Sequence, residues 1–155
     1  MNRTPSAAAL LHVALQDLHA GKAMQAERFG AIAGAARDPA LRAVLAEEIV
    51  RAGAQAKRLA TLTDVGGAPE NLWMKGVLDD AARDARSHQP GAILDIALVG
   101  AIRKAKAAEI VSTETALSLA AREAPAMLPA LEANCEEEIT TDRALRERLS
   151  VLARL

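Results

Sequence analysis

The chain has 155 residues, of which 51% are hydrophobic and 1% aromatic, and its formal net charge is −1 at pH 7. Balanced charge gives no basic field for nucleic acid, and no run of 18 or more apolar residues predicts a membrane span, so neither is an expected partner. Abundant Ala, Leu, Arg and Glu with few β-branched or aromatic residues predict an all-α fold, and the length predicts a single domain over residues 1–155.

The first predicted hairpin consists of two long helices joined by a tight turn. The first helix is expected from residue 5 or 6 to residue 36. The apolar segment at residues 6–15 continues in phase with this helix, so we interpret it as helix rather than a secretion signal. Asp38 can cap the second helix and Pro39 suits its first turn. That helix is expected to run to about Leu62, before the glycines at residues 66 and 67.

A crossover of about 28 residues follows, and it contains a short helical pattern. The apolar residues of this pattern are Leu72, Trp73, Met74, Val77, Leu78 and Ala81. We expect Trp73 to pack over a groove or an end of the bundle. An exposed Trp73 at a dimer interface is the alternative.

The second predicted hairpin begins near Gly91, and its first helix ends near Glu123. Pro125 and Pro129 flank the start of the last helix, which reaches the C-terminus. Two antiparallel hairpins with one long crossover are the topology of a ferritin-like four-helix bundle. Cys135, the only cysteine, is expected to be a buried apolar residue. Because it permits no intramolecular disulfide, a reducing, cytoplasmic setting is the default expectation.

Each long helix has an apolar face whose spacing alternates between four and three residues and is interrupted near its middle by polar residues. Lys22-x-x-Gln25 in the first helix also matches Lys106-x-x-Glu109 in the third, which is a weak internal repeat. Buried charges are costly unless they are paired or bind something. The interruptions therefore predict one shared polar layer, made of Lys22, Gln25, Glu48, Lys106, Glu109, Glu138 and Asp142.

Several segments together resemble the YciE/YciF-type ferritin-like proteins, a bacterial family often associated with stress. They read DPAL at residues 38–41, QAKRL at 55–59, MKGVLDD at 74–80, EI at 109–110 and EEITTD at 137–142. The resemblance implies a four-helix bundle with an extra crossover helix that often dimerises, so a homodimer is expected. It also implies a di-metal site of carboxylates and histidines between the helices.

The chain departs from this family pattern at the expected ligand positions. Lys22 and Lys106 stand where the family carries glutamates, and Glu48 stands where a histidine is usual. An ammonium cannot coordinate a metal and repels a cation 4 Å away by about 4 kcal/mol at an effective dielectric near 20. We therefore predict no cofactor and no catalytic residue.

In place of a metal centre, the sequence predicts buried ion pairs. Lys22 is expected to pair with Glu48, and Lys106 with Glu138, Asp142 or both. One alternative is a single iron or manganese ion at Glu109, Glu138 and Asp142; another is that some of these side chains reach solvent. The histidines are not expected to be ligands, because His12 and His19 flank the first apolar face and His88 lies in the crossover.

These observations favour a non-enzymatic structural or interaction protein, with a stress-associated role implied by the resemblance alone. No Ser-His-Asp arrangement, phosphate-binding glycine loop or paired-cysteine motif is present. The rival hypothesis is a non-haem iron or manganese protein with ferroxidase or peroxide-related activity. A third is a small-molecule binder that uses the polar layer as its anchor.

Overall fold

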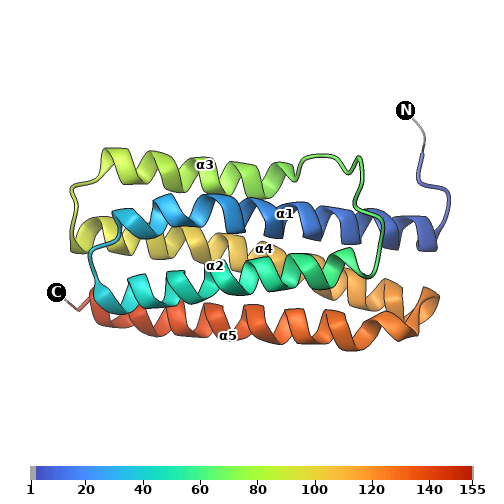
Figure 1. Cartoon of the computed structure of the whole chain (residues 1–155). Helices are drawn as coiled ribbons and strands as arrows, with labels where there is room; N and C mark the ends of the chain where they lie inside the picture. Colours follow the sequence, from blue (N-terminus) through green and yellow to red (C-terminus); the bar gives the residue numbers. More distant parts are fainter. Residues whose placement is uncertain (1–2, 155) are drawn as a thin grey trace.

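The computed structural model describes residues 3–154, which form five α-helices and one turn of 3₁₀ helix (Figure 1). The elements are α1 (Ala7–Ala35), α2 (Pro39–Ala60), α3 (Leu72–Ser87), α4 (Ala92–Glu123), η1 (Pro125–Met127) and α5 (Leu128–Leu152). Four long helices form the bundle, and α3 lies along the outside against α1 and α4. The predicted all-α bundle of two antiparallel hairpins and a helix-bearing crossover is confirmed.

The starts of the first two helices follow from their capping residues. The backbone N–H of Ala9 donates to Oγ of Ser6 at 3.1 Å. Ser6 is therefore the N-cap, and α1 begins at Ala7. The backbone N–H of Leu41 donates to the carboxylate of Asp38 at 2.7 Å. With Pro39 in the first turn of α2, the predicted capping arrangement is confirmed.

Two helix ends differ from the prediction. α2 ends at Ala60, two residues before Leu62, because the Thr61 N–H contacts two carbonyls of the preceding turn and tightens it. α3 continues to Ser87, six residues beyond the predicted pattern. Four of its six added residues are charged or polar, and an ion pair between Arg83 and Asp80 supports its exposed face. An apolar pattern alone could not show that extension.

The crossover is fixed to α1 by the residues at the start of α3. The buried Asn71 side chain donates to the backbone carbonyl of Asp17 at 2.8 Å and caps α3 by accepting from the Met74 N–H. Trp73 is half-buried and donates its indole N–H to the Asp17 carboxylate at 2.9 Å. A Cβ on Gly21 would lie 2.9 Å from the Asn71 side chain, so α1 needs glycine there. Trp73 thus packs against α1 and the larger apolar core.

The hydrophobic core divides into two clusters along the bundle. The larger cluster lies toward the α1–α2 connection and is built from all five helices; it includes Phe29, Leu41, Leu78, Leu98 and Leu145. The smaller cluster includes Leu11, Leu15, Leu59, Ala116 and Leu131. Cys135 is buried, as predicted. Within residues 3–154, no helix is long and apolar enough to cross a membrane.

Candidate functional site

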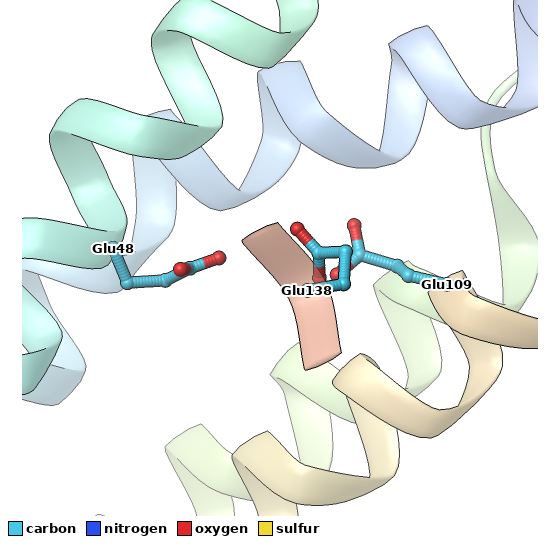
Figure 2. A group of neighbouring side chains, drawn as sticks. All are labelled: Glu48, Glu109 and Glu138. Carbon is cyan, nitrogen blue, oxygen red and sulfur yellow. The ribbon is translucent and has the colours of Figure 1, made fainter. Parts of the chain in front are cut away.

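A polar layer separates the two apolar clusters, and all four bundle helices contribute to it. Its members, each no more than 2% exposed, are Lys22 and Gln25 of α1, Glu48 of α2, Lys106 and Glu109 of α4, and Glu138 of α5. We call these six side chains the polar layer. Figure 2 shows the three glutamates converging from three helices toward the bundle centre. The structure therefore brings together six of the seven predicted residues.

Lys106 is the central cation of the polar layer. Its Nζ pairs with Glu48, and it lies 2.9 Å from Oε2 of Glu109 and 2.8 Å from Oε2 of Glu138. It also donates to Oε1 of Gln25 at 3.0 Å. Burial disfavours this ammonium, but the three surrounding carboxylates outweigh burial and raise its pKa above the ordinary lysine value. Lys106 is therefore held in the charged form.

Lys22 is the second cation, and it lies between two of the same carboxylates. Its Nζ is 2.7 Å from Oε1 of Glu109 and donates to Oε1 of Glu138. The side-chain amide of Gln25 donates to Glu109 as well, which orients that carboxylate. Glu109 and Glu138 thus each bridge the same two ammonium groups.

The predicted pairing of Lys22 with Glu48 is wrong, and the antiparallel hairpin explains why. Lys22 lies 15 residues before Arg37 in the connection, whereas Glu48 lies 11 residues after it. Glu48 is therefore about one helical turn nearer the connection than Lys22. At that depth Glu48 meets Lys106 instead. The predicted pairing of Lys106 with Glu138 is present in the structure.

Asp142 lies outside the polar layer, which corrects its predicted place there. Its half-buried carboxylate accepts two hydrogen bonds from Arg103 of α4, at 2.7 and 3.2 Å. Thr141 takes the inward position instead, and its buried hydroxyl donates to Oε2 of Glu48 at 2.9 Å. Thr141 and Asp142 follow Glu138 by three and four residues, and both spacings return to the helix face of Glu138. Spacing alone therefore did not show which of the two points inward. The sequence signal for Thr141 was a hydroxyl-bearing residue three positions after Glu138, on the same helix face.

The ionisation of the carboxylates reflects competition between burial and the two ammonium groups. Burial raises the pKa of Glu109 to about 7, against the opposing attraction of Lys106 and Lys22. Burial also favours a higher pKa for Glu138. The attraction of Lys106 and Lys22 is stronger there, so the pKa of Glu138 is held well below its usual range. Arg51, at the edge of the layer, lies 3.7 Å from Glu48 and is 28% exposed, so solvent weakens its contribution.

The donor set of the polar layer does not fit the di-metal centre that the resemblance implied. Carboxylate oxygens of Glu48, Glu109 and Glu138 lie within 4.8 Å of one another, which is a spacing that a cation could bridge. However, the Lys106 ammonium contacts all three, and an ammonium offers no lone pair to a metal. No histidine belongs to the metal-compatible group found within residues 3–154, and His12 contacts Thr63 instead.

Comparisons with known proteins identify the fold and leave the chemistry open. The family described as "Domain of unknown function (DUF892)" matches residues 6–154. The crystal structure of the E. coli stress protein YciF is similar, with a TM-score of 0.91 and 18% identity over 96% of this chain and 98% of that one. YcfI from Rhodopseudomonas palustris, described as "a putative structural protein", has a TM-score of 0.85 and 19% identity over 94% and 96%. A search of curated proteins finds no match.

Proposed function

We propose that this chain, which belongs to the DUF892 family of YciE/YciF-type proteins, is a non-enzymatic structural or interaction protein. In this proposal, the two buried lysines take over the role that metal ions would have in a ferritin-like bundle. They neutralise carboxylates that converge from three helices, and they tie those helices to α1. The stress association of YciF is the support for extending a stress-related role to this chain.

The observation that carries the proposal is the environment of Lys106. Its ammonium is fully buried and contacts three carboxylates and one amide oxygen. A divalent ion at the centre of the same carboxylates would have to share this space with a fixed positive charge. Ion pairs also offer no open coordination position and no electron to transfer. The layer is therefore suited to holding helices in register rather than to ferroxidase or peroxide chemistry.

We include a homodimer and a cytoplasmic location in the proposal. Exposed apolar residues support self-association, among them Leu72 on the crossover helix α3 and Val50 on α2, each 75% exposed. The interface would be the crossover helix or an alanine-rich helix face. Light scattering coupled to size exclusion should give twice the chain mass, whereas a monomer at micromolar concentration would contradict this part.

Metal analysis of the purified protein tests the proposal. Protein from cells supplied with iron and manganese should contain well under one metal ion per chain. Near-stoichiometric iron or manganese would overturn the proposal and support the rival metal-binding function, for which Glu48, Glu109 and Glu138 are the available carboxylates.

A double variant tests whether the two lysines stabilise the bundle through their charge. The double variant K22E/K106E replaces both ammonium groups with carboxylates, so it should be strongly destabilised without metal. Added Mn²⁺ or Fe²⁺ should then partly restore its stability, because a cation is once more required at the centre. A double variant that is as stable as the wild type without metal would show that the lysines do not neutralise the layer.

A further inference from the structure

The charges of the polar layer do not balance when every group is ionised. Two ammonium groups face three carboxylates, so the layer would carry one excess negative charge inside the core. At its edge, Arg103 is paired with Asp142, which lies outside the layer. Arg51 lies 3.7 Å from Glu48, but it is 28% exposed and donates its hydrogen bond to Thr141, so solvent screens its charge and leaves the excess largely uncompensated. Among the described residues, the ion pairs of the layer include none from α3. A buried uncompensated charge is unfavourable, so one group must be neutral.

The geometry indicates which groups carry the compensating proton. Glu109 and Glu138 both place Oε1 on Lys22 and Oε2 on Lys106, so they face one another across the same two ammonium groups. Oε2 of each glutamate is buried and has no hydrogen-bond partner of suitable geometry. A proton on one carboxyl can satisfy an oxygen of the other. Glu48 differs, because Lys106 and Thr141 each donate a hydrogen bond to it.

We propose that Glu109 and Glu138 share one proton, which makes the polar layer neutral and makes the stability of the bundle sensitive to pH near neutrality. Two carboxyl groups at one site cannot both ionise freely, and the first proton lost comes from the better-stabilised partner. This inference rests on the proposed function, since a metal ion at the same position would displace the proton.

The direction of the pH dependence follows from the pKa of Glu109. Burial raises the pKa of this carboxyl from its ordinary value of 4.5 to about 7. Between these values the folded chain holds a proton that the unfolded chain has released. Folding stability therefore falls as the pH rises from about 4.5 through about 7, and it changes no further above that range on this account. The folded bundle should therefore be more stable in mild acid than at neutral pH.

Infrared spectroscopy of the wild-type protein tests the shared proton directly. A buried protonated carboxyl gives a C=O stretching band distinct from that of ionised carboxylates. This band should be present at pH 6, shift in D₂O, and weaken by pH 9. It should be lost in E109Q and kept in E114Q, a matched control because Glu114 is an exposed glutamate on the same helix. Absence of the band from folded wild-type protein at pH 6 would overturn the inference.

Denaturant unfolding supplies the second test. From pH 5 to pH 8 the folded-to-unfolded ratio of the wild type and of E114Q should fall on the order of 50-fold. In E109Q, whose amide mimics the protonated acid, the fall should be within roughly 3-fold. If E109Q retains the full decrease, the titrating group lies elsewhere and the inference fails. If E109Q does not fold, the wild-type infrared band decides.

Metal analysis distinguishes failure of this inference from failure of the proposed function. Metal-free protein without a protonated-carboxyl band would overturn only the shared proton. Stoichiometric metal would overturn both.

Discussion

Replacing Lys106 with methionine tests the central cation of the polar layer. Methionine fills much of the space of the lysine stem, so the change removes the charge with little loss of packing. Three carboxylates would lose their shared ammonium. Lys22 would remain, and its ion pairs among the described residues are with Glu109 and Glu138. Removing one partner of a buried ion pair costs about 3–5 kcal/mol. A domain of this size typically has a stability of about 5–15 kcal/mol, so the loss is a large share.

Equilibrium unfolding in urea at pH 7.5 measures this effect, and Lys104→Met is the matched control. Lys104 lies on the same helix, 3.6 Å from Asp80, with its side chain 68% exposed. The control should change stability by less than about 0.5 kcal/mol. A decrease of about 4 kcal/mol in Lys106→Met should lower Tm by roughly 8–16 °C.

The pH dependence of the same variant shows whether the cost is electrostatic. Its carboxylates can take up protons in mild acid, so the destabilisation of Lys106→Met should be smaller at pH 5 than at pH 8. A loss below about 1 kcal/mol at pH 7.5 would refute the view that Lys106 neutralises the layer. A large loss that is equal at both pH values would assign the role of Lys106 to packing.

Three further predictions concern the surroundings of the layer. Asp95 of α4 is buried and accepts two backbone N–H groups of the α1–α2 connection at 2.8 and 2.9 Å, so Asp95→Ala should destabilise by about 2–3 kcal/mol in urea unfolding. Gly21→Ala should lower Tm and loosen α3, because the added Cβ would meet Asn71; proteolysis within the crossover should quicken, and unchanged proteolysis would contradict the close approach. Glu138, whose pKa is held low, contributes stability that is present above pH 4.5 and is lost as the pH falls below it, so E138Q should flatten the acid limb of a stability profile.

Local sequence patterns were sufficient for the number of long helices and for the start of α2. Asp38 and Pro39 begin α2 as predicted, since capping depends on a few neighbouring residues. The end of α3 was missed because its last turns carry charged residues rather than an apolar face. The family match and the similar solved structures confirm the resemblance that the segment order predicted.

The sequence by itself determined that charged residues would interrupt the apolar faces of the four bundle helices, because helical periodicity assigns each residue to a face. It also determined that lysines stand at two of the interruptions. Only the tertiary structure decided the partners, because these depend on the depth of each residue along antiparallel helices and on the choice between adjacent inward positions. One turn of depth moved Glu48 from Lys22 to Lys106, and one residue of rotation put Thr141 in place of Asp142.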